Sequence, residues 1–93
     1  MTVKTNYILS PKVTALYADY RNSNKPLAVI TIEFTLFEKQ SKNDDTVILM
    51  HKTFTATTTL KQKNTFNLVN GWNNDLQKIL RQLTHQLRYT CKV

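Results

Sequence analysis

Residues 66–89 read FNLVNGWNNDLQKILRQLTHQLRY, and this stretch decides the fold. Its large apolar side chains recur at steps of three and four residues, which is the pattern of an amphipathic α-helix. A single long helix with one apolar face needs a second layer to cover that face, and the rest of the chain must supply it. The positions that carry the pattern are Val69, Trp72, Leu76, Ile79, Leu80, Leu83 and Leu87.

Three segments upstream of this helix have the composition and alternation of β-strands. The clearest is 27–38, LAVITIEFTLFE, in which apolar residues alternate with threonine and glutamate. Residues 46–59 show a similar alternation, whereas 7–20 carry apolar side chains in both registers. The segments between them, RNSNKP and KQSKNDD, have the composition of a polar turn and a charged loop.

This order predicts an α/β fold of the α+β type, with β-β-β-α order in a single domain over 1–93. The strands form an antiparallel meander over 7–20, 27–38 and 46–59, and the helix, 66–89, packs on one face. Asn64 or Thr65 is expected to cap the helix, and Gly71 inside it indicates close packing. The expected core comprises Ile30, Ile32, Phe34, Phe54, Trp72, Leu76, Ile79, Leu83 and Leu87.

One helix covers only one face of such a sheet, so apolar residues on the other face would be left open. Val13, Tyr17, Val29 and Phe37 are the candidates, and we expect them to form a partner surface. Two explanations stay open. The chain is part of a larger α/β sandwich, or it is a homo-oligomer.

The composition limits the classes of function. The net charge of +7 attracts phosphates and anionic membranes without selecting either. Cys91 is the single cysteine, so no intramolecular disulfide forms. The sequence holds no apolar run of transmembrane length, and its opening, MTVKTNYIL, lacks the apolar region of a signal peptide.

The sequence carries no catalytic signature. His51 and His85 fall on different elements without neighbouring ligands, and no nucleophile has a base beside it. The single glycine excludes a glycine-rich phosphate loop. We therefore expect no enzyme activity, no metal site and no cofactor.

A small basic nucleic-acid-binding module is the alternative function, and it would be cytoplasmic. Three strands followed by a helix is also the order of the double-stranded-RNA-binding domain. The basic cluster expected at the start of that domain's last helix is absent here, where the turn reads FNLVNGWNND. Net charge alone supports this alternative.

The sequence resembles the C-terminal half of the ABC-type transport auxiliary lipoprotein family, the PqiC-like group. The similar features are an opening NYIL…VTALYAD, a strand VITIEFTLF, an apolar run VILMHKTF and a helix LVNGWNNDLQKILRQLTHQL. The resemblance covers residues 6–88, about half of the usual family domain. The chain departs from the family in lacking a lipobox and the N-terminal half.

The resemblance implies a non-catalytic binding or docking subunit of a bacterial envelope lipid-transport system. Its expected partners are an MCE-type protein, the ABC permease and ATPase, and lipid. The expected location is the periplasm, with a membrane anchor on the full-length protein. The resemblance also implies an α/β sandwich in which the missing half would cover the open sheet face.

Overall fold

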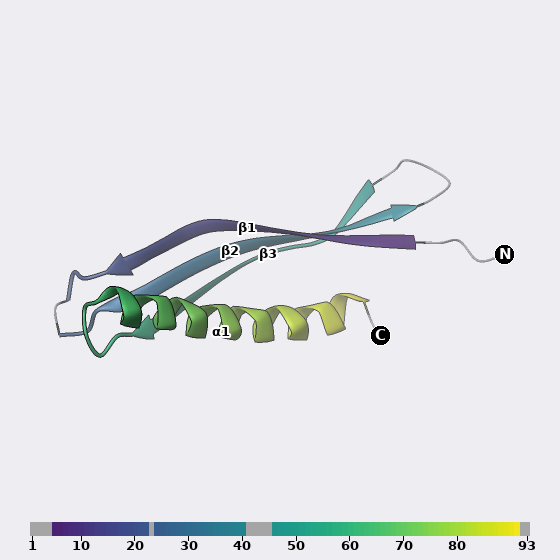
Figure 1. Cartoon of the computed structure of the whole chain (residues 1–93). Coiled ribbons are helices and arrows are strands. Elements are labelled where there is room, and N and C mark those ends of the chain that lie inside the picture. Colours follow the sequence, from purple (N-terminus) through teal and green to yellow (C-terminus); the bar gives the residue numbers. More distant parts are fainter. Residues whose placement is uncertain (1–4, 23, 41–45, 92–93) are drawn as a thin grey trace.

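The computed structural model describes residues 5–22, 24–40 and 46–91. In that part of the chain, β1 (Thr5–Asp19), β2 (Leu27–Gln40) and β3 (Thr46–Thr59) are followed by α1 (Thr65–Cys91). The strands form one antiparallel sheet in the order β1-β2-β3, and α1 lies along one of its faces (Figure 1). The predicted α+β arrangement is confirmed.

The observed element ends lie within two residues of the predicted ones. β1 begins and ends earlier than the expected 7–20, β2 runs two residues past 38, and β3 has the predicted bounds. α1 extends one residue before and two residues after the expected 66–89. Residues 41–45 of the predicted charged loop lie outside the described residues.

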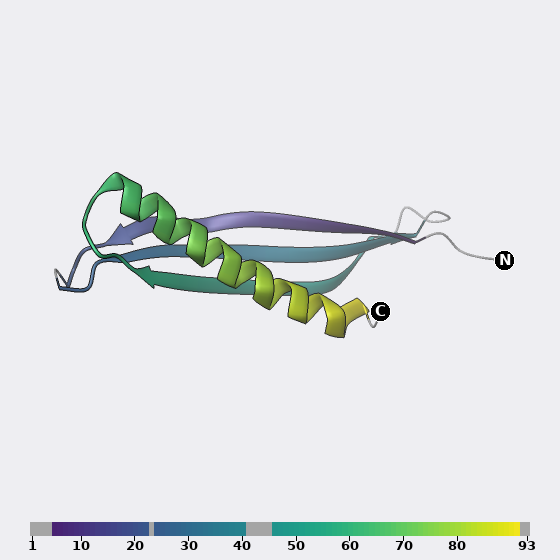
Figure 2. The same cartoon turned by 60° about the horizontal axis from the view of Figure 1, so that its bottom comes forward.

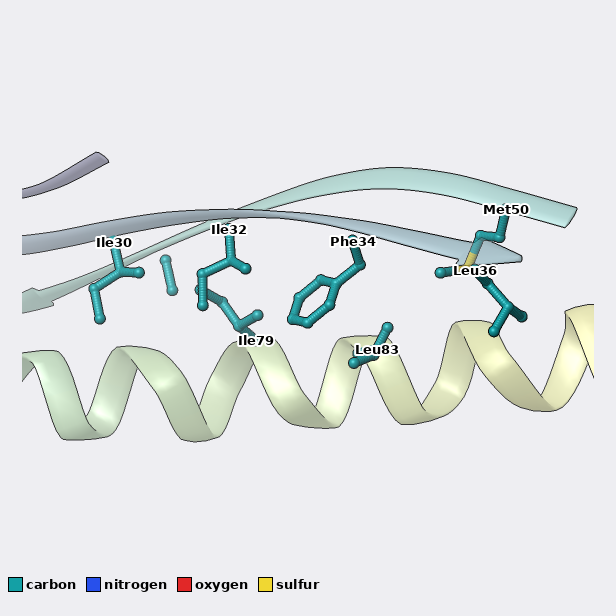
Figure 3. Packing of buried hydrophobic residues seen from close by; sticks show 8 residues of the cluster. Ile30, Ile32, Phe34, Leu36, Met50, Ile79 and Leu83 are labelled. Carbon is teal, nitrogen blue, oxygen red and sulfur yellow. The ribbon is translucent and has the colours of Figure 1, made fainter. Parts of the chain in front are cut away.

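The core lies between β2, β3 and α1. The alternation along β2 turns Ile30, Ile32, Phe34 and Leu36 toward the helix, where all four are buried. From α1, Ile79 and Leu83 point into this layer, as Figure 3 shows. Phe54, Trp72 and Leu87 pack against the same cluster while partly buried, so eight of the nine predicted core residues lie there.

The helix is rotated relative to the predicted stripe. Leu76 keeps 37% of its surface exposed, so its predicted place in the core is wrong. The preceding residue, Asp75, is fully buried instead. Asp75 lies four residues before Ile79, so both side chains are on the helix face that meets the sheet. Leu76 therefore lies to one side of that face, where it is partly exposed.

Two close contacts fix the first turns of the helix. Asn64 is the N-cap, because its Oδ1 accepts a hydrogen bond of 2.8 Å from the backbone N–H of Asn67. At Gly71 an added Cβ would lie 2.7 Å from the Ala28 Cβ and 2.7 Å from the Leu60 Cδ2. The glycine therefore allows α1 to approach the sheet closely, as predicted from its position.

A bulge in β1 explains the apolar residues in both of its registers. Val13 pairs with Ile32 and Ala15 pairs with Thr31, so Thr14 is an extra residue with no register partner in β2, although its hydroxyl donates to the Thr31 carbonyl over 3.4 Å. A bulge reverses the face on which later side chains lie. Val13 and Leu16, three residues apart, therefore both lie on the helix side, opposite Ile32 and Ile30.

A second bulge redirects the start of β3. Leu36 pairs with Met50, but Phe37 pairs with Ile48, which leaves Leu49 as the extra residue. Ile48 consequently shares the outer face with Phe37, and it is exposed. Regular alternation along 46–59 would place Ile48 on the face of Met50, and the bulge moves it to the opposite face.

Candidate docking surface

Over residues 9–16, the helix side of β1 is not covered by α1. α1 packs on β2 and β3, and a helix about 10 Å wide spans roughly two strands spaced about 4.8 Å apart. The third strand is left open, with Val13 58% and Leu16 53% exposed. Leu9, on the same side of β1 and opposite Leu36, is exposed as well. The floor of this open region is therefore apolar.

The flank of α1 that faces β1 is apolar too. Its exposed residues are Val69, Leu76 and Leu80, spaced seven and four residues apart along one side of the helix. They form a wall beside the uncovered strand. We call the combined surface the β1 step; it consists of Leu9, Val13 and Leu16 of β1 with Val69, Leu76 and Leu80 of α1.

Two hydrogen bonds establish which flank of the helix faces which strand. The Trp72 indole Nε1–H donates to the Tyr17 carbonyl of β1 over 3.2 Å. On the other flank, Lys78 Nζ donates to the Thr57 carbonyl of β3 over 2.6 Å. Figure 2 shows α1 crossing the sheet obliquely, so that the helix starts beside the end of β1 and moves away from that strand. The β1 step therefore widens from Trp72 toward the C-terminal end of α1.

The structure does not bring the four predicted partner residues together. Val13 lies on the helix side, whereas Tyr17 and Phe37 lie on the outer face. Val29, also on the outer face and opposite Tyr17, is only 5% exposed and so offers no contact surface. Phe37 lies eight residues along β2 from Val29, the partner of Tyr17, which at about 3.3 Å per residue separates the two by roughly 26 Å. The predicted surface is therefore not a single patch.

The centre of the outer face is polar rather than apolar. Thr31 and Thr55 are hydrogen-bonded across β2 and β3 at 2.8 Å, and Thr35 contacts His51 Nδ1 at 3.1 Å. Glu33 lies between these pairs, 3.6 Å from His51 Nε2. The centre of this face is therefore compatible with water. Exposed apolar side chains on the outer face lie toward the other end of the sheet, at Ile8 and Ile48 on either side of Phe37.

The exposed surface of α1 is cationic. The single acidic residue of the helix, Asp75, is fully buried, while Lys78, Arg81 and Arg88 are exposed. Arg81 and Arg88 line a shallow hollow of about 390 Å³ together with Leu80, Thr84 and His85. Leu80 therefore belongs both to the apolar wall and to a surface of positive charge.

Asp75 is a buried carboxyl with one satisfied oxygen. The Thr58 hydroxyl donates to Asp75 Oδ1 over 2.6 Å, and Oδ2 has no hydrogen-bond partner. Burial raises the pKa of this carboxyl, and the Thr58 hydrogen bond and the charge of Lys78 oppose that rise. Lys78 lies 3.3 Å from the same Thr58 hydroxyl. This polar cluster holds α1 against β3 on the side away from the β1 step.

Two features of the helix sequence indicate the β1 step, whereas the alternation of the strands does not. The apolar stripe of 66–89 covers a wider arc than contact with two strands requires, because Leu76 and Leu80 extend it to one side. Asp75 lies inside that stripe, between Trp72 and Ile79. The two registers of β1 were visible, but the bulge at Thr14 that reconciles them was not.

His85 lies beside Leu80 in the lining of the hollow on α1. His85 stacks edge-on against Tyr89, with ring centroids 5.0 Å apart. Within residues 5–22, 24–40 and 46–91, no three His, Cys, Asp or Glu side chains are grouped closely enough to hold a metal ion. Among the helical residues described, no segment is long and apolar enough to cross a membrane.

Comparison with known proteins adds no relatives. No protein-family model matches the sequence. Neither the curated proteins nor the solved structures yield a match. The resemblance to the ABC-type transport auxiliary lipoprotein family therefore stays a prediction.

Proposed function

We propose that this chain is a non-catalytic docking subunit that binds its partner through the β1 step. The observation that carries the proposal is the exposure of Val13 and Leu16 beside an apolar helix flank. A small domain gains stability by burying such side chains, about 1.5–3 kcal/mol for each one fully buried. Leaving several of them open in one place is typical of a surface that binds another molecule.

The specific form of the proposal comes from the sequence resemblance. It assigns the chain to an envelope lipid-transport system, with an MCE-type protein and the ABC permease and ATPase as partners. The location in that case is the periplasm. The open step on β1 supports this role because it leaves an apolar surface for another component of such a system to cover.

The test is direct binding between purified components. The chain is immobilised, and an MCE-type protein and an assembled permease–ATPase complex are passed over it in biolayer interferometry. Saturable binding that is lost in a Leu16→Gln variant supports the docking role. Lack of binding to either component would refute the assignment to lipid transport.

A nucleic-acid-binding module is the second candidate, and one observation favours it. No carboxylate is exposed on α1, so Arg81 and Arg88 present uncompensated positive charge. Phosphate binding predicts affinity that falls steeply with added salt. Fluorescence anisotropy with a labelled duplex at physiological ionic strength distinguishes the two functions, because the docking role predicts no saturable binding there.

A further inference from the structure

The shape and charge of the β1 step point to one kind of occupant: we infer that it binds an acidic amphipathic helix of a partner protein, lying beside α1 over β1. This inference rests on the docking role proposed above and specifies what docks. The partner helix places its apolar side on Val13, Leu16, Leu76 and Leu80. Its carboxylates face Arg81 and Arg88.

The dimensions of the step fit a helix. α1 rises above the sheet by its own diameter of about 10–12 Å, so the uncovered face of β1 is the floor of a step of that height. The wall from Val69 to Leu80 is about 17 Å long at 1.5 Å per residue. The floor from Leu9 to Leu16 is about 23 Å long at 3.3 Å per residue. A helix of three to four turns fills this space and covers both apolar rows.

An added strand is a poorer occupant. Pro11 has no N–H to donate, and the bulge at Thr14 interrupts the regular ladder near the middle of β1. Both features are ways in which natural proteins prevent pairing at a sheet edge. Binding over the face of β1, rather than along its edge, avoids both obstacles.

Charge selects an acidic partner over a second copy of this chain. Two copies of α1 side by side would bring Arg81 and Arg88 near their counterparts without any exposed carboxylate on either helix. The other acids among the described residues are Asp19, paired with Arg21 at 2.7 Å, Glu33 on the outer face, and Glu38 near the far end of β2. None lies on the exposed side of α1, so attraction has to come from a partner of opposite charge.

A lipid bilayer fits the charge but not the shape. A flat surface resting on the outer side of α1 would stand about one helix diameter above Val13 and Leu16. Those two residues are among the most exposed apolar side chains of the step, and a bilayer would leave them uncovered. A partner helix that lies over β1 would contact both Val13 and Leu16.

The test uses a synthetic peptide as the probe. The peptide has 18 residues, with leucine at core-facing helical positions and glutamate elsewhere, and a second peptide carries lysine in place of every glutamate. Both are titrated into the isotope-labelled chain and followed by NMR. The inference predicts saturable shifts at Val13, Leu16 and Leu80 with the glutamate peptide, and at least about tenfold weaker binding of the lysine peptide.

Matched variants locate the site. Leu80→Gln and Arg88→Glu are each expected to weaken binding of the glutamate peptide about tenfold. Ile48→Gln removes an exposed apolar side chain on the outer face, and Lys12→Glu makes the same charge change outside the step; neither is expected to alter affinity. An equal loss of affinity for the glutamate peptide in the step variants and in their controls would overturn the inference.

Two further outcomes separate this inference from the proposed function. If the transport components bind but the glutamate peptide does not compete with them, a helix in the β1 step is refuted and the docking role stands. Binding of the peptide at the step with no binding of those components would refute the transport role alone. Sedimentation with phosphatidylglycerol vesicles that depends on Leu80, without peptide binding, would replace the helix by a membrane surface.

Discussion

Replacing Asp75 by asparagine is expected to stabilise the fold at neutral and alkaline pH. The carboxyl is fully buried, only one of its oxygens has a partner, and burial raises its pKa. Asparagine keeps an oxygen for the Thr58 hydroxyl and has nearly the same volume. The substitution therefore removes the buried charge without opening a cavity.

The magnitude follows from two opposing effects. A buried polar group without a partner costs about 1–3 kcal/mol, and more when it is charged. Because asparagine places an unpartnered NH2 group where Oδ2 lies, the substitution removes only the part of this cost that is due to charge. The hydrogen bond from Thr58 becomes weaker when its acceptor is neutral, by roughly 1 kcal/mol. The net gain is about 1 kcal/mol, which for a domain of this size raises the melting temperature by roughly 4–8 °C.

The pH dependence gives the sharper test. A raised folded-state pKa means that the contribution of Asp75 is greatest below the unfolded value of 3.8 and is lost as pH rises through the folded value. Wild type and Asp75→Asn are therefore expected to be about equally stable near pH 4 and to diverge by about 1 kcal/mol near pH 8. Urea denaturation of both proteins at the two pH values measures this.

Asp19, whose pKa is also shifted, does not affect the comparison of wild type with Asp75→Asn. The pKa of Asp19 is lowered to about 2 by the hydrogen bonds from Arg21, so its contribution is lost only as pH falls from 3.8 toward that value. Both proteins share this effect, and it cancels in the comparison. A variant less stable than wild type near pH 8 would refute the reasoning.

Three further substitutions test the packing. Asn64→Ala removes the helix cap and should cost about 1 kcal/mol, measured by urea denaturation; no loss would exclude Asn64 as the cap. Gly71→Ala places a methyl group against the Ala28 Cβ and should cost about 1–3 kcal/mol from overpacking despite its gain in helix propensity; a higher melting temperature would contradict the close approach. Ile79→Ala should cost about 2–5 kcal/mol, whereas the same change at Leu80 should cost much less; equal losses would refute the helix orientation.

The sequence was sufficient for the arrangement of the elements because local patterns decide it. The alternation in 27–38 and the three-and-four spacing in 66–89 each specify an element and its buried face. Short polar connections then favour antiparallel neighbours. Ile30, Ile32, Phe34, Ile79 and Leu83 were placed in the core for these reasons, and they are buried there.

The open surface could not be placed in the same way. Its position depends on the bulge at Thr14, which moves Leu16 onto the face of Val13, and on the rotation that buries Asp75 in place of Leu76. Both features result from tertiary packing, which determines a register that local alternation leaves open. The outer face was expected to be apolar from Tyr17, Val29 and Phe37, but the threonines between them make its centre polar.

The most direct test of the account is the solvent exposure of individual methyl groups in the free chain. Paramagnetic relaxation by a soluble gadolinium chelate, read in methyl NMR spectra, reports this for each residue. An open β1 step predicts strong relaxation of the Val13, Leu16, Leu76 and Leu80 methyls and weak relaxation at Ile79 and Leu83. Protection of Leu16 and Leu80 equal to that of Ile79 would show that the β1 step is already filled, and would contradict the docking surface.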